Sequence, residues 1–105
     1  MLVLIYITCQ DKSEAKNIAN TLLKMRLCGC CNIIDEIDSM YWWENKIESD
    51  EESVLIVKTI ESKIDDIIAK VKQIHSYDNP CILAIPTLKI SDDYRDFIEK
   101  EVDGD

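Results

Sequence analysis

Two segments of the sequence are apolar on both of their alternating faces, and this pattern limits the folds that the chain can adopt. Residues 2–8 read LVLIYIT, and residues 54–59 read VLIVKT. Successive side chains of a strand point to opposite faces of a sheet, so each segment offers apolar side chains to both sides. Such strands are typical of the centre of a sheet that is covered on both faces.

A helix and a long hairpin are predicted to lie between these two strands. Asp11 and Glu14 form a D-x-x-E capping box, and the helix that they start is expected to end near Gly29. Residues 31–59 are extended in pattern on both sides of the ENK triplet at 44–46. Asn45 can adopt the left-handed conformation that a tight turn at this triplet requires.

The second half of the chain is predicted to contain a second helix, a last strand and a short C-terminal helix. Ser62 and Asp65 are expected to cap a second helix, whose isoleucines and valine recur at spacings of three and four residues. The stretch CILAIPTL (81–88) is predicted to be the last strand, with Pro86 indicating a sheet edge. Ser91 is expected to cap a short C-terminal helix.

This order of elements predicts one α+β domain over residues 1–105, with the ferredoxin-like β-α-β-β-α-β arrangement. Right-handed crossovers then give the strand order 4-1-3-2. Both helices cover the same face of the sheet, so the other face needs a partner. Trp42 and Trp43 are consecutive and point to opposite sides of the hairpin, which adds apolar surface that one subunit cannot bury. We therefore expect an oligomer.

The charge of the chain excludes several classes of partner. The sequence has 21 acidic and 12 basic residues and a formal charge of -9, which repels nucleic acid and anionic lipid. No stretch approaches the roughly 18 apolar residues of a membrane span, and the N-terminus lacks the features of a signal peptide. We expect a cytoplasmic protein with neither a membrane nor a nucleic acid as partner. Its five cysteines are then expected to be reduced.

The cysteines suggest two different roles. Cys28, Cys30 and Cys31 lie in the stretch LCGCCN (27–32), where we interpret them as small, buried residues at a helix-to-strand junction. We place the end of the first strand and the starts of the second and fourth strands at one edge of the sheet. Cys9 and Cys81 would then approach each other there.

The second role suggested for the cysteines is to bind a soft metal ion at Cys9 and Cys81. His75 lies in the turn before the last strand, at the same end as Cys9 and Cys81. Two thiols and an imidazole favour copper or zinc over Mg²⁺. The alternative is that these residues only pack, because no H-x₃₋₅-H spacing indicates a structural zinc site.

Four motifs, in order and over nearly the whole chain, resemble the CutA family of divalent-cation-tolerance proteins. LCGCCN resembles L-A-A-C-V-N, SMYWWENKIE resembles S-x-Y-x-W-x-G-K-x-E, EESVLIVKT resembles E-x-x-x-x-x-x-K-T, and HSYDNP resembles H-P-Y-E-x-P. The resemblance implies a homotrimer whose hairpins wrap around adjacent subunits, with the hairpin aromatics Tyr41 and Trp43 at the interface. We expect Trp42 there as well, because it points to the opposite side of the hairpin from Trp43. Cys81 stands where the family commonly has Glu, which exchanges a hard oxygen ligand for a soft sulfur.

The resemblance implies a non-enzymatic homotrimer linked to tolerance of divalent metals such as copper, with weak metal binding and no obligatory cofactor. An alternative is a PII-like signalling trimer, in which Lys58 and Tyr77, with His75, hold a small anionic ligand between subunits. An enzyme of the acylphosphatase type needs an Arg in the first loop, and CQDKSEA offers none.

Overall fold

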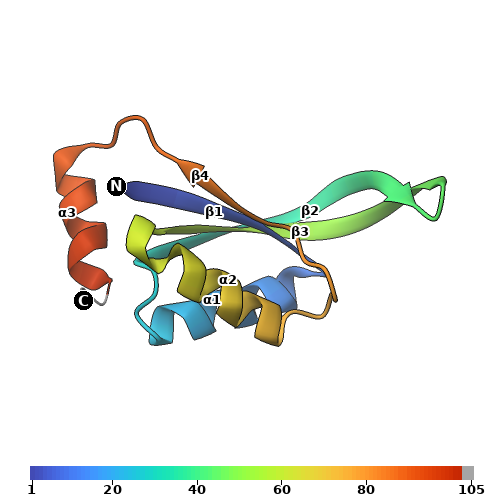
Figure 1. Ribbon diagram of the computed structural model, residues 1–105, viewed down its shortest axis with the longest axis horizontal. Coiled ribbons are helices and arrows are strands. Elements are labelled where there is room, and N and C mark those ends of the chain that lie inside the picture. Colours follow the sequence, from blue (N-terminus) through green and yellow to red (C-terminus); the bar gives the residue numbers. More distant parts are fainter. Residues whose placement is uncertain (103–105) are drawn as a thin grey trace.

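The computed structural model describes residues 1–102, which form a four-stranded antiparallel sheet with three α-helices (Figure 1). The elements in chain order are β1 (Leu2–Cys9), α1 (Lys12–Lys24), β2 (Cys30–Trp43), β3 (Lys46–Ile60), the 3-10 turn η1 (Glu61–Lys63), α2 (Ile64–Ile74), β4 (Ile82–Pro86) and α3 (Asp92–Glu101). The strand order is β2-β3-β1-β4. The predicted α+β, ferredoxin-like arrangement and the order 4-1-3-2 are confirmed.

One face of the sheet carries α1 and α2, and the main core lies beneath them (Figure 1). The odd-numbered residues of β1, such as Ile5 and Ile7, point into this core and are fully buried. They meet the apolar faces of the helices, represented by Leu22 of α1 and by Ile67 and Val71 of α2. The 3.6-residue repeat of apolar side chains explains why each helix presents one face to the sheet.

The start of α1 confirms the predicted cap, but its end does not agree with the prediction. The N–H of Glu14 donates to Oδ1 of Asp11 at 2.9 Å, as a capping box requires. The helix stops at Lys24 rather than near Gly29. Arg26 adopts a left-handed φ of 58°, and the N–H of Leu27 donates to the Leu22 carbonyl at 3.0 Å. This Schellman-type ending closes the helix without a glycine.

The predicted caps of the other two helices are not made by side chains. Ser62 lies within η1, and the N-cap residue of α2 is Lys63 rather than Ser62. Ser91 occupies the N-cap position of α3, but its hydroxyl makes no capping hydrogen bond. Asp92 and Asp93 lie in the first turn of α3, where negative charge stabilises a helix N-terminus.

The hairpin is long, and it contains one irregularity that the sequence did not indicate. Glu44 and Asn45 have φ of 50° and 65°, so the turn is of the left-handed, primed kind and the expectation for Asn45 is confirmed. The register shifts between Ile34 and Ile37, where Glu36 has a φ of 57°. A bulge at this point increases the local twist and redirects the far part of the hairpin.

The strand directions correct one prediction. Cys30 pairs with Lys58, which pairs with Leu4 near the start of β1, whereas Cys9 pairs with Ser53. Cys30 and Cys31 therefore lie at the opposite end of the sheet from Cys9, not at a shared edge. The physical reason is that each step across an antiparallel sheet reverses the strand direction. β2 is two steps from β1, so it runs in the same direction as β1.

The other face of the sheet is largely open. The helix α3 covers only the end at which β1 begins, where Leu2 packs with Ile98 and Val102 (Figure 1). Leu83 and Ile85 of β4 pair with Tyr6 and Leu4 on the open face. They are 53% and 43% exposed in the single chain. The predicted bare face is present.

Candidate functional site

Cys9 and His75, two of the residues predicted to bind metal, lie close together at one end of the sheet. One ligand atom from each of Cys9, His75 and Glu14 lies within 4.8 Å of the others. We call these three residues the sheet-end cluster. Cys81, the third predicted ligand, is not part of this group, and Glu14 takes its place. The sequence indicated Glu14 only as a helix cap.

His75 is held by two backbone groups that differ in hydrogen-bonding role. Its Nε2 lies 2.8 Å from the carbonyl oxygen of Thr8, and its Nδ1 accepts a hydrogen bond from the N–H of Tyr77 at 3.0 Å. Because Nδ1 accepts the N–H of Tyr77, the ring proton is on Nε2. Nε2 therefore donates to the Thr8 carbonyl. The imidazole side chain has no exposed surface. Both ring nitrogens are therefore already engaged.

Glu14 ties the loop after α2 to the start of α1. One carboxylate oxygen accepts the N–H of Gln10 at 2.8 Å, and the other accepts the N–H of Ser76 at 2.7 Å. Burial acts to raise the pKa of Glu14, but the hydrogen bonds from Gln10 and Ser76 outweigh it and lower the pKa below its ordinary value. His75 Nδ1 lies 3.9 Å from the same carboxylate. The cluster thus fastens β1, α1 and the α2–β4 loop to one another.

Cys9 is a buried thiol rather than a preformed thiolate ligand. Burial is the largest cause that raises its pKa to about 12, and the negative charges of Glu14, Glu52 and Asp11 add to the effect. A metal ion at the cluster would have to displace the Cys9 proton and one of the two hydrogen bonds of His75, from Nε2 to Thr8 or from Tyr77 to Nδ1. The donor set of sulfur, nitrogen and oxygen suits Zn²⁺ or copper, but binding has to overcome these existing bonds.

The register of β4 explains why Cys81 lies outside the cluster. Ile82 pairs with Ile7 and packs against the core beneath the helices. Cys81 immediately precedes β4, so strand alternation continued by one residue would place its side chain on the other side of the sheet from Ile82. Cys9 belongs to the core on the helix side. A difference of one residue in register therefore separates the two thiols.

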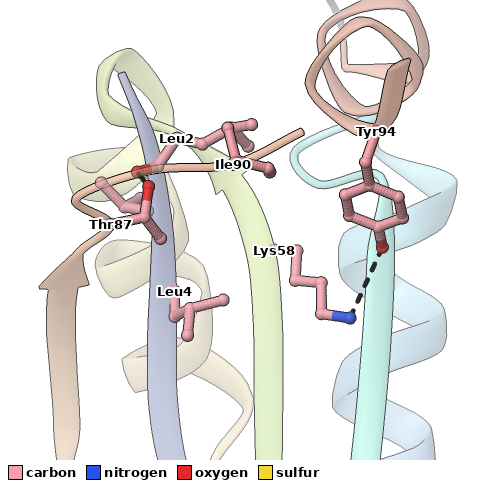
Figure 2. A pocket seen from close by; sticks show the side chains of 7 residues that line it. Leu2, Leu4, Lys58, Thr87, Ile90 and Tyr94 are labelled. Carbon is pink, nitrogen blue, oxygen red and sulfur yellow. Dashed lines mark hydrogen bonds between the residues drawn. The ribbon is translucent and has the colours of Figure 1, made fainter. Parts of the chain in front are cut away.

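Lys58 and Tyr77, predicted to share a ligand, lie at different ends of the sheet. Lys58 pairs with Leu4, and its ammonium lies 3.4 Å from the hydroxyl of Tyr94 (Figure 2). The Tyr77 hydroxyl instead donates to Glu52 at 2.7 Å. Within one chain the two residues cannot hold the same small molecule.

A small cavity of about 100 Å³ lies beside Lys58. Figure 2 shows that its walls come from β1, β3, the segment that leads into α3, and Tyr94 of α3. The lining is mainly apolar, with Leu2, Leu4 and Ile90 among its residues. The cavity is too small for a nucleotide, because drug-sized ligands occupy clefts of roughly 300–1,000 Å³.

The stretch LCGCCN, whose cysteines are expected only to pack, contains a pair of thiols in contact. The sulfur atoms of Cys28 and Cys31 lie 3.7 Å apart, and all five cysteines are free thiols. The signal that could have indicated this pair is its C-x-x-C spacing, formed by residues 28–31. Such spacing is a feature of redox-active and metal-binding cysteines.

Comparison with known protein families gives one consistent result. The sequence model of the family described as CutA1 divalent ion tolerance protein matches residues 3–101. A divalent-cation tolerance protein CutA from Archaeoglobus fulgidus is 42% identical over 99 residues, covering 94% of this chain and 96% of that protein. The chloroplastic protein CutA 1 of rice is 39% identical over 84 residues, covering 80% of this chain. The chain spans only 48% of the rice protein.

Solved structures agree with this assignment. The structure described as the periplasmic divalent cation tolerance protein CutA from Archaeoglobus fulgidus superimposes with a TM-score of 0.95 at 42% identity, covering 98% of this chain and all of that chain. CutA1 from Oryza sativa superimposes with a TM-score of 0.96 at 33% identity, covering 99% of this chain and 95% of that chain.

The comparisons do not support the alternative of a PII-like signalling protein, and the separation of Lys58 from Tyr77 removes its proposed ligand pair from the single chain. Over residues 1–102, no helix is long and apolar enough to cross a membrane. The match over residues 3–101 and the agreement of the folds lead to one assignment: the chain belongs to the CutA1 divalent ion tolerance protein family.

Proposed function

We propose that the protein acts as a non-enzymatic homotrimer in tolerance of divalent or soft metal ions such as copper, and that it needs no obligatory cofactor. The observation that carries the assembly is the large apolar surface of the single chain. Trp42 and Trp43 are 72% and 62% exposed at the far end of the hairpin. Exposed apolar surface of this extent is typical of an interaction site.

The hairpin is shaped to reach another subunit. β1 ends at Cys9, opposite Ser53, so the part of β3 before Ser53 pairs only with β2. This part projects beyond the body of the molecule (Figure 1). Trp42 pairs with Ile47 and Trp43 with Lys46, so the two indole rings lie on opposite faces of the projection. A segment that carries an indole ring on each face can contact two surfaces at once, as in a ring of subunits.

The open face of the sheet supplies a surface that such a hairpin can cover. Leu83, Ile85 and Ile34 are exposed on it, and β4 is an edge strand with unpaired backbone groups. The number of three subunits comes from the resemblance to CutA. Tyr41, whose hydroxyl donates to Asp50, lies on the same arm of the hairpin and is proposed to join the interface.

Metal binding is proposed at the sheet-end cluster of Cys9, Glu14 and His75. The three residues supply one sulfur, one oxygen and one nitrogen within 4.8 Å. Because Cys9 is protonated and His75 is fully hydrogen-bonded, we expect weak binding of copper or zinc that opens these bonds. Cys81 stays a predicted ligand that would have to turn toward the cluster.

A location in the cytoplasm stays a prediction from the sequence. The rice relative is named chloroplastic, and the Archaeoglobus fulgidus structure is described as periplasmic. We retain the expectation that neither nucleic acid nor a membrane is a partner, because the chain carries a formal charge of -9.

Native mass spectrometry and sedimentation of the purified protein test the assembly. We expect a trimer at micromolar concentration. Trp43→Ala should shift it toward smaller species, because truncation of a buried Trp typically costs about 3–5 kcal/mol. Phe97→Ala, which removes a half-exposed aromatic ring from α3, is the matched control and should leave the trimer intact. A monomeric parent protein would contradict the proposal.

Competition with a chromophoric chelator tests the metal site. The reduced parent protein should bind Cu(I) or Zn²⁺, and Cys9→Ser should lower that affinity at least tenfold while the trimer persists. Cys81→Ser tests separately the ligand set of Cys9, His75 and Cys81 that the sequence predicts. If Cys9→Ser binds both metals as tightly as the parent, the sheet-end cluster is not the site.

A further inference from the structure

The three cysteines of LCGCCN are divided between the two sides of the sheet. Cys28 belongs to the core beneath α1 and α2, and Cys31 packs against that same core. Cys30 packs instead against the cluster of α3, together with Tyr94. The alternation of side chains at the start of β2 explains why Cys30 and Cys31 lie on opposite sides, and Cys28 lies in the turn before the strand. It leaves Cys28 and Cys31 as a pair and sets Cys30 apart from them.

We propose that Cys28 and Cys31 form a reversible disulfide when the protein meets a hydroperoxide, so that this junction is an oxidation site. Their sulfur atoms lie 3.7 Å apart in the reduced protein. A disulfide bond is about 2.05 Å long, so the sulfur atoms need to approach by less than 2 Å. No other two cysteines are in sulfur contact within residues 1–102.

The backbone around the pair is already fixed in place. The N–H of Gly29 donates to the Lys58 carbonyl at 3.0 Å, and the hydroxyl of Thr59 donates to the Leu27 carbonyl at 2.6 Å. Both bonds anchor the junction to β3. The contact between the two sulfur atoms is therefore part of the ordered fold. A disulfide here closes a ring of only four residues, which restricts the unfolded chain little and favours reversibility over structural stabilisation.

The contact between the two sulfur atoms allows both steps of the oxidation. The sulfur atoms of Cys28 and Cys31 are in hydrogen-bond contact, and this contact lowers the pKa of the Cys28 thiol and raises that of Cys31. Either sulfur can attack the peroxide, and the other then lies beside the sulfenic acid as the resolving thiol.

The reaction balances with one hydroperoxide. The sulfur of one cysteine attacks one peroxide oxygen, the O–O bond breaks, and the leaving oxygen takes up the thiol proton as water or an alcohol. That cysteine is then a sulfenic acid. The sulfur of the other cysteine attacks it, the S–O bond breaks, the second thiol proton leaves with the hydroxide as water, and the S–S bond forms. Two thiols are oxidised and one peroxide is reduced.

The burial of Cys28 and Cys31 limits which oxidants can reach their sulfur atoms. Cys28 is 2% exposed, and Cys31 is only partly exposed. A bulky disulfide cannot reach Cys28 without opening the fold, whereas hydrogen peroxide is close to water in size. We therefore infer that small hydroperoxides, rather than disulfide-exchange proteins, are the oxidants of this pair.

The test treats the full-length reduced protein with a small excess of hydrogen peroxide, blocks the remaining thiols under denaturing conditions, and maps the tryptic peptides without reduction. Leu27 to Lys46 forms one peptide that contains all three cysteines of the junction and neither Cys9 nor Cys81. We expect this peptide to lose two hydrogens and to carry one alkyl group, on Cys30. Dithiothreitol should restore three alkylated cysteines.

Single substitutions assign the pair. Cys30→Ser should form the disulfide as the parent does, whereas Cys28→Ser and Cys31→Ser should lose it. Cys31 is the less buried partner, so Cys31→Ser keeps the test valid if Cys28→Ser fails to fold. The proposal is overturned if the parent peptide gains only oxygen, if dithiothreitol does not reverse the change, or if Cys30→Ser abolishes the bond.

Discussion

Substitution of His75 should measure how strongly the sheet-end cluster holds the fold. His75→Ala removes the donor to the Thr8 carbonyl and the acceptor for the Tyr77 N–H, at 2.8 and 3.0 Å. A buried backbone group left without a partner costs about 1–3 kcal/mol. Water can reach part of this loop, so we take the lower half of that range for each group. The expected loss in the free energy of unfolding is about 2–4 kcal/mol.

His75→Asn separates the two hydrogen bonds. The side-chain oxygen of Asn can accept the N–H of the residue two positions later, which here is Tyr77, in an Asx turn. Its side chain is too short to reach Thr8. We therefore expect a loss of only about 1–2 kcal/mol, roughly half that of His75→Ala.

Urea unfolding at one fixed protein concentration is the assay, because subunit association makes apparent stability depend on concentration. With a denaturant slope of about 2 kcal/mol per molar, His75→Ala should lower the midpoint by about 1–2 M. Gln73→Ala, at an exposed position of α2, is the control and should change the stability by less than about 0.5 kcal/mol. Equal losses for His75→Ala and His75→Asn would refute the reasoning.

Three further predictions concern the core. Thr59→Val should cost about 1–3 kcal/mol, because it leaves the buried Leu27 carbonyl without its donor, and Thr59→Ser should restore most of the loss in urea unfolding. Gly29→Ala should lower the thermal midpoint, since its Cβ would lie 3.0 Å from Cδ1 of Ile98, an overpacking of about 1–3 kcal/mol; an unchanged midpoint would contradict this. Cys9, whose pKa is raised to about 12, should resist iodoacetamide at pH 8, where about one thiol in 10,000 is ionised, and should react fully in urea.

The fold was predictable because the strong local signals agreed with one another. The apolar repeat of α2, the D-x-x-E box before α1 and the turn at Asn45 each specify a local structure that tertiary contacts then retain. The helix ends were less predictable. Arg26 ends α1 in a left-handed conformation that residues of its type rarely adopt, so no glycine marked the position.

The site was less predictable than the fold because it depends on side-chain direction. The D-x-x-E pattern predicts Glu14 only as a helix cap, yet its carboxylate also accepts the N–H of Ser76, 62 residues away. No local pattern indicates such a contact. The position of Cys81 along the sheet predicts it to be a ligand beside Cys9, but one residue of register decides the face on which its side chain lies. The direction of β2 could have been obtained by counting antiparallel steps from β1.

Because β2 runs in the same direction as β1, the proposed disulfide of Cys28 and Cys31 and the proposed metal site at Cys9 lie at opposite ends of the sheet. Cys31 is opposite Val57 on β3, and Cys9 is opposite Ser53. Four residues of β3 span about 13 Å, and the two cysteines lie on strands at either side of β3, about 10 Å apart. One metal ion within a single chain cannot take ligands from both places, since its bonds to sulfur are about 2.3 Å long. Cys31→Ser should therefore abolish the disulfide without changing metal affinity at Cys9, and Cys9→Ser should do the reverse. If either substitution alters both properties while the trimer persists, the two sites are not independent, and a contact between subunits must join them.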